Sequence, residues 1–308
     1  FPTDQHGWAE LLPARPARPA LTGKHRVPWT VVGAGVTGLA CARRLGELHP
    51  DQTILLLDAR LVGQGASGRN SGFAVGITHF DGPFDSGKAG EYRRINRINQ
   101  AGIDALRAQI TRHGIECQWR EDGIHYAAAD HLAIQERENF LPYLEAMEIS
   151  HTPLDTEMLH SRLGTALYRT GVHVHPGALL HPAALVHGLA DSLPGNIVLH
   201  EQSPVLAINP GRPLSLELPG GTVQTDKLLL ATNNEAAKLG FQRYALTGST
   251  LSGSFTRVLN DAEFASMGSL GEWGILSLHG GGATVRLTAD RRICIRNTAE
   301  YHGAALLS

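Results

Sequence analysis

The strongest constraint on how this chain folds is a glycine pattern near its start, Gly33-Ala34-Gly35-Val36-Thr37-Gly38. The apolar run 29–32 before it predicts a strand, and the apolar residues after it recur at helical spacing, which predicts a helix over 37–48. A second, almost entirely apolar run over 53–58 is typical of a parallel strand that is covered on both faces. Together these segments predict one β-α-β unit.

An acidic residue indicates what this unit binds. Asp58 closes the second strand 20 residues after Gly38, where a carboxylate accepts hydrogen bonds from a ribose. In such a unit Gly33 makes the tight turn, Gly35 lets the backbone approach a pyrophosphate, and Gly38 lets the helix pack on the strand. The helix N-terminus attracts the phosphates. The alternative is an ordinary glycine-rich turn. We predict a bound dinucleotide, and the motif by itself does not choose between NAD and FAD.

Composition narrows the class of protein further. The chain has 308 residues, 42% of them hydrophobic and 18% charged, which excludes a disordered chain or a coiled coil. With 27 basic and 29 acidic residues, nothing favours a nucleic acid or an anionic membrane as partner. The apolar runs are far shorter than the roughly 20 residues that span a bilayer. Three widely spaced cysteines suit reduced thiols, so we expect a soluble, cytoplasmic protein.

The rest of the chain predicts an α/β protein with further strands. Residues 1–28 read as an extended arm, and the Gly- and Ser-rich loop 63–90 is long enough to be functional. We expect helices over 90–113, with Ile98 towards the core, over 130–148, bent or ended by Pro142, and over 182–193. Strands are expected over 124–128, 172–174, 197–200, 205–208, 214–218, 222–225 and 227–232, with a hairpin over 284–296.

The loop after Asp58 points to a family. The run Arg60-Leu61-Val62-Gly63-Gln64-Gly65-Ala66-Ser67-Gly68-Arg69-Asn70-Ser71-Gly72 resembles the second flavin loop of the FAD-dependent amine and amino-acid oxidoreductases, which include D-amino acid oxidase, glycine oxidase, sarcosine oxidase and γ-glutamylputrescine oxidase. Residues 181–190, Ser203-Pro204-Val205 and Leu230-Ala231-Thr232-Asn233-Asn234 resemble further segments of this family in the same order. The Gly68-Arg69-Asn70 stretch is most similar to the branch around γ-glutamylputrescine oxidase.

The resemblance implies a fold of the α/β and α+β classes in two domains. A Rossmann-like FAD-binding domain would comprise residues 1–78 and 177–240, and a mixed-sheet substrate domain residues 79–176 and 241–308. The implied FAD contacts are Gly33, Gly35, Val36, Thr37, Gly38, Asp58, Ala59, Arg60, Ala66, Ser67, Arg69, Asn70, Ser71, Gly72, Val205, Thr232 and Asn233.

The resemblance also implies a reaction: hydride transfer from the carbon beside a neutral amine to flavin N5, hydrolysis of the imine, and reoxidation by O2 or another acceptor, with O2 giving H2O2. We take His79, Trp273 and His279 as candidate catalytic residues beside the ring. Each also has a plain structural alternative, such as a core position for Trp273. No metal is expected, because His173 and His175 lack a placed carboxylate or cysteine partner.

One face of the 284–296 hairpin carries Arg292, Cys294 and Arg296, with Arg286 near them on the partner strand. An arginine on a face that looks into the substrate cavity can clamp a carboxylate, whereas the alternative is a solvated sheet face.

Members of the family continue well beyond the equivalent of residues 296–298. We therefore expect a second polypeptide to complete the FAD domain and to pair with an apolar edge at 227–232; the alternatives are a fragment of a longer chain and a degenerate homologue. Two further readings stay open: a non-catalytic nucleotide- or flavin-binding subunit, and an NAD-dependent dehydrogenase, in which the 66–72 loop has no role.

Overall fold

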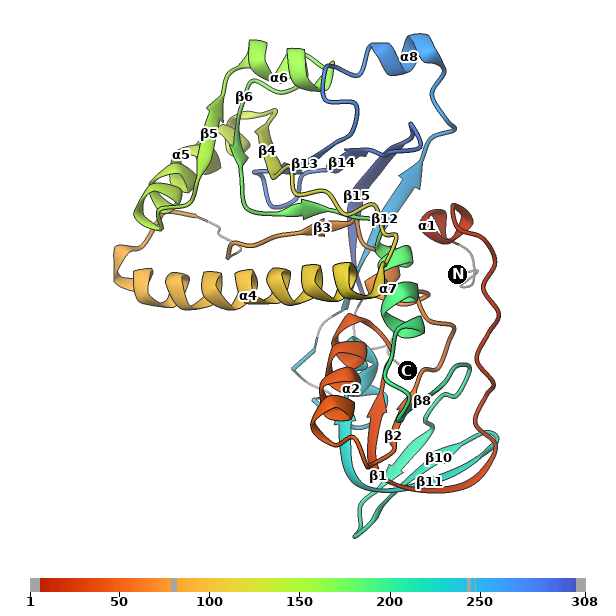
Figure 1. The fold of residues 1–308 in the computed structure, drawn as a ribbon. Coiled ribbons are helices and arrows are strands. Elements are labelled where there is room, and N and C mark those ends of the chain that lie inside the picture. Colours follow the sequence, from red (N-terminus) through yellow and green to blue (C-terminus); the bar gives the residue numbers. More distant parts are fainter. Residues whose placement is uncertain (1–5, 79–81, 243–244, 247, 303–308) are drawn as a thin grey trace.

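The computed structural model describes residues 6–78, 82–242, 245–246 and 248–302. Two large sheets organise the chain, and helix α4 (Ala89–His113) lies across the molecule between them (Figure 1). A two-stranded ribbon of β3 (Phe73–Ala74) and β7 (Ala178–Leu179) lies in the same middle region.

The first sheet has six strands in the order β8-β2-β1-β11-β10-β9. Strands β1 (Gly23–Val32), β2 (Ile54–Leu57), β8 (Ile197–His200) and β11 (Gly221–Leu230) run parallel. Strand β10 (Leu214–Leu218) pairs antiparallel with β11 on one side and with β9 (Ala207–Asn209) on the other. The predicted β-α-β unit is therefore the centre of a mostly parallel sheet.

Both faces of this sheet are buried at β2, which explains why β2 is apolar throughout. Leu56 packs into a cluster with residues of α2 (Val36–Leu48) and α7 (Pro182–Asp191), whereas Leu55 and Leu57 pack on the opposite face with Leu21 and Leu216. Alternate residues of a strand point to opposite faces, so a strand between two cores has no position for a polar side chain.

The second sheet has seven strands in the order β12-β15-β14-β13-β4-β6-β5. They are β12 (Gly248–Phe255), β15 (Ile293–His302), β14 (Thr284–Leu287), β13 (Trp273–Ser277), β4 (Ile124–Ala128), β6 (Thr170–Val174) and β5 (His151–Leu154). Helices α5 (His131–Ala146) and α6 (Thr156–Leu163) pack on this part, and α8 (Asp261–Ala265) precedes β13. Most pairs are antiparallel, and β13 and β4 are parallel.

Short elements complete the chain. Helices α1 (Gly7–Glu10) and α3 (Ala66–Arg69) lie near α7, and one-turn 3₁₀ helices span Ser86–Lys88 and Asn233–Ala237. None of the helices in the described ranges combines the length and apolarity needed to cross a membrane.

Four details differ from the sequence-based expectations. Strand β1 begins at Gly23 rather than at residue 29, because Gly23–Val27 pairs with Gly221–Thr225 before Pro28 interrupts the ladder. The two runs expected at 222–225 and 227–232 form the single strand β11. Pro142 lies inside α5 without ending it, because Phe140 and Tyr143 on either side are both buried. Ile98 is 58% exposed rather than directed to the core.

Candidate nucleotide site and adjoining cavity

The glycine pattern lies where the carboxyl ends of β1 and β11 meet. Gly33 has φ +102°, and an added Cβ there would lie 2.4 Å from the carbonyl oxygen of Ala231. A Cβ at Gly38 would lie 1.7 Å from the carbonyl oxygen of Gly33. Both positions therefore require glycine, because a side chain would overlap backbone that cannot move away.

Asp58 lies directly beside this turn. Its carboxylate accepts hydrogen bonds from the backbone N–H groups of Ala34 at 2.7 Å and Arg60 at 2.9 Å, and burial raises its pKa. The backbone N–H of Ser203 donates to the carbonyl oxygen of Asp58 at 2.7 Å, so the segment leading to Val205 runs along the same edge. Asp58 and the segment Ser203-Pro204-Val205 are thus neighbours.

The 60–72 loop closes over the first glycine turn. Ser67, on α3, accepts a hydrogen bond at its Oγ from the backbone N–H of Val36 at 3.1 Å. Asn70 shapes its own loop: its amide donates to the carbonyl oxygens of Ala66 and Ser67, and its Oδ1 accepts from the N–H of Gly72. Gly72 has φ +73° and packs against Arg286. Small residues from two loops thus surround the N-terminus of α2.

These features fit the pyrophosphate of a dinucleotide. Helix α2 has 13 residues, and its N-cap residue Gly35 has no side chain that could cap it. Ser67 accepts from the N–H of Val36, and the dipole of the helix still favours an anion at this end. A Cβ at Gly35 would meet only the Ser67 side chain, at 2.8 Å, which leaves an open approach over the backbone. The buried Oγ1 of Thr232 has no hydrogen-bond partner in the described part of the chain, and a ligand hydroxyl or phosphate would satisfy it.

The structure brings the expected cofactor residues to one edge of the six-stranded sheet. They occupy four segments, 33–38, 58–72, 203–205 and 231–233, which contact one another through the hydrogen bonds and close approaches described above. Ala59, Arg60, Arg69 and Asn70 are exposed at this edge, whereas Gly38 and Gly72 are buried. The contacts of these residues with a cofactor remain a prediction.

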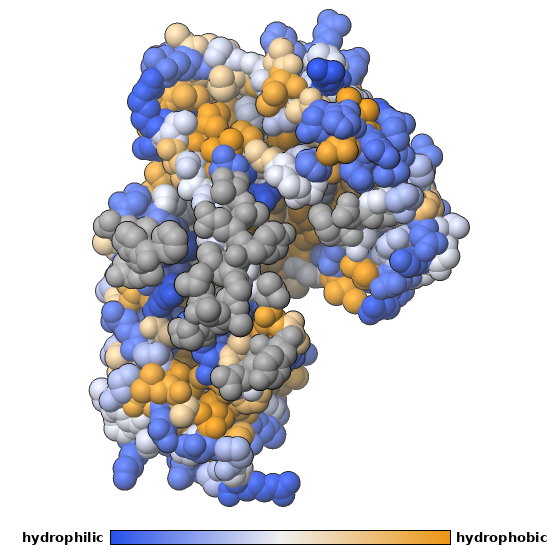
Figure 2. Space-filling model, turned by 180° about the vertical axis from the view of Figure 1, so that it is seen from behind, coloured by the Kyte–Doolittle hydropathy of each residue, from blue (hydrophilic) through white to orange (hydrophobic). Residues whose placement is uncertain are grey.

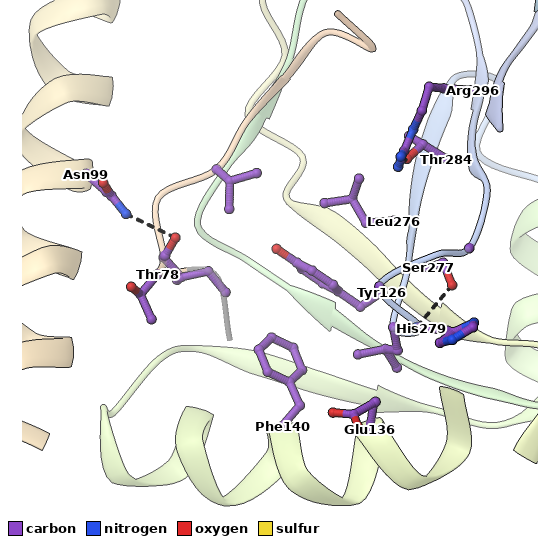
Figure 3. Close-up of a pocket in the computed structure, with 15 residues that line it drawn as sticks. Thr78, Asn99, Tyr126, Glu136, Phe140, Leu276, Ser277, His279, Thr284 and Arg296 are labelled. Carbon is purple, nitrogen blue, oxygen red and sulfur yellow. Dashed lines mark hydrogen bonds between the residues drawn. The ribbon is translucent and has the colours of Figure 1, made fainter. Parts of the chain in front are cut away.

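A cavity of about 440 Å³ lies beyond the end of the 60–72 loop. Its walls come from the segment after the loop, from α4 and α5, and from four strands or their ends in the seven-stranded sheet (Figure 3). Seen from behind, the surface between the two parts of the molecule is hollowed (Figure 2). The lining side chains include Val75, Ile77, Thr78, Asn99, Tyr126, Glu136, Phe140, Leu276, Leu278, His279, Thr284 and Arg296.

The candidate catalytic residues have different positions relative to this cavity. His279 lines it just after β13, and its backbone N–H donates to Ser277 Oγ at 3.1 Å. Trp273 is 4% exposed, packs into the core with Leu159 and Ile275, and donates its indole N–H to the carbonyl oxygen of Met267. It does not line the cavity, because it lies on the face of β13 opposite to Leu276. His79 lies outside the described residues.

The arginines of the hairpin also differ in their positions relative to the cavity. Arg296 lines the cavity, where its guanidinium donates to Thr284 Oγ1. Arg286 is fully buried and donates to the carbonyl oxygens of Ser71, Gly72 and Leu180 and to Glu272. Arg292 pairs with Asp290 at 2.9 Å. Arg296 is therefore the arginine of this face that is placed to meet a ligand.

His173 on β6 and His175 just after this strand lie elsewhere. His173 stacks on the buried His125 with ring centroids 4.4 Å apart, and the His175 ring forms hydrogen bonds with the hydroxyls of Ser150 and Thr152. In the ranges that the structure describes, no three His, Cys, Asp or Glu side chains are grouped so that they could hold a metal ion.

Sequence reasoning missed several residues that the structure places at the site. Tyr126, Glu136 and Phe140 line the cavity, and Trp8 donates its indole N–H to the carbonyl oxygen of Asn70 at 2.8 Å. Glu136 and Phe140 share one face of α5 at a spacing of four residues, but that spacing alone does not show that the face borders a cavity. The sequence of the predicted arm, residues 1–28, did not indicate that its first residues contact the 60–72 loop.

A mostly parallel sheet with a glycine-rich turn, a mixed sheet beside it and a cavity at the end of a glycine-rich loop are typical of the class of flavoprotein oxidoreductases. Residues 29–307 match the family described as FAD dependent oxidoreductase, and the chain belongs to this family, whose cofactor is FAD.

The chain is similar to several characterised or solved proteins. It is 28% identical over 251 residues to the probable oxidoreductase OrdL of Rhizobium meliloti (strain 1021), covering 76% of this chain and 56% of that protein. It is 32% identical over 156 residues to the gamma-glutamylputrescine oxidoreductase of Escherichia coli (strain K12), covering 47% and 36%. The glycine oxidase structure from Geobacillus kaustophilus superposes with a TM-score of 0.70 at 18% identity, covering 91% of this chain and 73% of that one.

The chain spans about half of the length of the curated relatives OrdL and a third of the gamma-glutamylputrescine oxidoreductase. The structural likeness to glycine oxidase, at 18% identity, concerns the fold. Substrate and reaction therefore have to be argued from the cavity itself.

Proposed function

We propose that this protein oxidises a primary or secondary amine or an amino acid with bound FAD. The observation that carries the proposal is that the 60–72 loop leads directly into the wall of the cavity, through Val75, Ile77 and Thr78. A cofactor held along this loop would end beside the cavity. When bound there, FAD would supply the acceptor for the hydride of the carbon beside the amine, with O2 as the final oxidant giving H2O2 and water hydrolysing the imine.

The side chains of the cavity would prepare an amine for this reaction. Val75, Ile77, Phe140, Leu276 and Leu278 form apolar walls. An apolar wall disfavours a charged ammonium and lowers the pKa of the bound amine, so that the neutral form that can lose a hydride becomes more populated. His279 lines the same space, and we propose that it receives the proton that the ammonium loses.

Arg296 gives the cavity a position for a carboxylate. Its guanidinium is held by Thr284 and, among the described residues, forms no ion pair. A planar guanidinium binds a carboxylate through two parallel hydrogen bonds. We therefore favour an amino acid over a simple amine as the substrate.

Three further parts of the proposal concern the whole protein. We assign the FAD domain to residues 1–78 and 177–240 and the substrate domain to the remainder. Lys227–Leu230 pairs with β1 on one side, and no strand of the described residues pairs with its other side, which supports a further polypeptide segment at this edge. Cys41, Cys117 and Cys294 are free thiols, which favours a reducing compartment such as the cytoplasm.

Absorption spectroscopy of the purified protein tests the proposal. We expect the visible bands of oxidised flavin, bleaching of these bands when an amino acid is added without oxygen, and their return with H2O2 on aeration. The variant Arg296→Gln should weaken the binding of amino acids at least tenfold and leave amines without a carboxylate unchanged. A colourless protein that takes up no added FAD would refute the proposal. Denaturing mass spectrometry of the coloured protein tests the further polypeptide.

A further inference from the structure

The wall of the cavity opposite Arg296 carries a negative charge. Glu136, in the first half of α5, lines the cavity, and its Oε2 accepts hydrogen bonds from the backbone N–H of Gly82 at 3.1 Å and from Asn139 Nδ2 at 3.4 Å. Both donors are neutral. No Lys, Arg or His among the described residues forms an ion pair with Glu136, and the neighbouring Arg137 pairs with Glu138 at 2.8 Å. Among the described residues, the carboxylate therefore has no ion-pair partner at the cavity wall.

Two aromatic rings line the same cavity as this carboxylate. Phe140 follows Glu136 by one turn on the same face of α5, and Tyr126 comes from β4, with ring centroids 5.0 Å apart. The Tyr126 hydroxyl points into the cavity (Figure 3). Burial raises the pKa of Tyr126, so its hydroxyl stays protonated at neutral pH. A carboxylate beside aromatic faces is a combination that attracts an ammonium group, through charge and through the ring quadrupoles.

The two charges lie on different walls. Arg296 and Thr284 come from the β14–β15 hairpin, whereas Glu136 and Phe140 come from α5, and Figure 3 shows Tyr126 between them. A ligand that reaches across the cavity would meet a cation at one end and an anion at the other. This separation favours a substrate whose far end is positively charged.

We propose that Glu136, Tyr126 and Phe140 form a subsite for a second ammonium group, so that the substrate is a basic amino acid, with its carboxylate at Arg296, rather than an amino acid with a neutral tail. The inference rests on the proposed function, because it assigns the far end of the same substrate. Glu136 selects the substrate here and takes no part in the oxidation itself.

Matched ligands of equal length test the subsite. Lysine is compared with norleucine, in both enantiomers, and 1,5-diaminopentane with pentylamine, by anaerobic flavin reduction in the full-length holoprotein. We expect at least tenfold tighter binding of the dicationic or basic member of each pair.

Glu136→Gln keeps an oxygen that can accept from Gly82, and it should abolish this preference while binding of pentylamine changes less than twofold. Glu138→Gln, on the same helix but paired with Arg137 and 65% exposed at its side chain, should leave the preference intact.

The outcomes separate the two proposals. If pentylamine and norleucine reduce the flavin as well as their charged counterparts do, the ammonium subsite is wrong and the proposed function stands. If none of the ligands reduces the flavin, the proposed function fails, and titration calorimetry of 1,5-diaminopentane and pentylamine against wild type and Glu136→Gln still decides the subsite. The subsite is supported if wild type binds 1,5-diaminopentane more tightly than pentylamine and Glu136→Gln does not. It is overturned if each protein binds the two ligands equally well.

Discussion

At the scale of single residues, the glycines of the nucleotide turn differ in what a side chain would meet. At Gly38 the first obstacle is the backbone of Gly33, 1.7 Å away, whereas at Gly35 it is the hydroxyl of Ser67, which can rotate away. Gly38 therefore matters for the fold itself. Gly35 faces the space that we assign to the pyrophosphate, so its role is in binding.

We predict that Gly35→Val leaves a folded protein that retains no FAD, because the added methyl groups occupy the approach to the helix N-terminus. Gly38→Ala should instead prevent folding. Circular dichroism and flavin absorbance after gel filtration measure the two effects separately. Gly102→Ala, an open helical position where a Cβ meets nothing within 4 Å, is the control and should retain FAD. Normal FAD content in Gly35→Val would show that the motif is only a structural turn.

At the scale of elements, one buried arginine joins the seven-stranded sheet to the 60–72 loop. Arg286 on β14 donates to the carbonyl oxygens of Ser71 and Gly72 at 3.2 and 3.1 Å and pairs with Glu272 at 3.1 Å. The indole of Trp8 lies 5.2 Å from its guanidinium and extends the same contact to the N-terminal arm. The hairpin, the 60–72 loop and the arm are thus fixed by one side chain.

We predict that Arg286→Met lowers the free energy of unfolding by roughly 3–5 kcal/mol, because it removes a donor from buried carbonyl oxygens and one of the two arginine partners of the buried Glu272 carboxylate, which keeps Arg120. Urea denaturation measures the loss. Limited proteolysis should also cut the 60–72 loop faster, since the loop loses its anchor. The control is Arg292→Met on the same hairpin, where the arginine pairs with Asp290 near the surface, and there the cost should stay below about 1 kcal/mol. Equal losses in the two variants would contradict the anchoring role.

At the scale of the whole molecule, buried histidines limit stability in acid. Burial lowers the pKa of His125 to about 3 and that of His181 to about 4. Both rings stay neutral in the native state, whereas in the unfolded chain they take up a proton near pH 6.5. The unfolded state then binds more protons than the native state, so stability falls as the pH drops from about 6.5 towards 4 and 3.

We predict that His125→Gln reduces this acid sensitivity. Between pH 7.5 and pH 5 the wild type should lose on the order of 2 kcal/mol of unfolding free energy through His125 alone, and the variant should not show that part of the loss. Urea denaturation at the two pH values gives the difference. His131 is exposed, and His131→Gln serves as the matched control substitution. An unchanged pH dependence in His125→Gln would show that this histidine is not the source.

The sequence by itself determined the nucleotide end of the protein. The β-α-β unit, its glycines and Asp58 follow one another closely along the chain, and their spacing is set by the local geometry of a strand, a turn and a helix. The apolar run of β2 likewise predicted burial on both faces, which Leu55 and Leu56 show in opposite cores.

Only the tertiary structure decided which side chains line the cavity. The period of two along β14 and β15 correctly placed Arg286, Cys294 and Arg296 on one face of the hairpin. That face is covered at one end by Trp8 and the 60–72 loop, which bury Arg286, and is open to the cavity at the other end, where Arg296 lies. Residues more than 200 positions apart in the chain create this difference. A strand's own pattern therefore fixes which residues share a face, whereas the packing of distant segments decides which of them can reach a substrate.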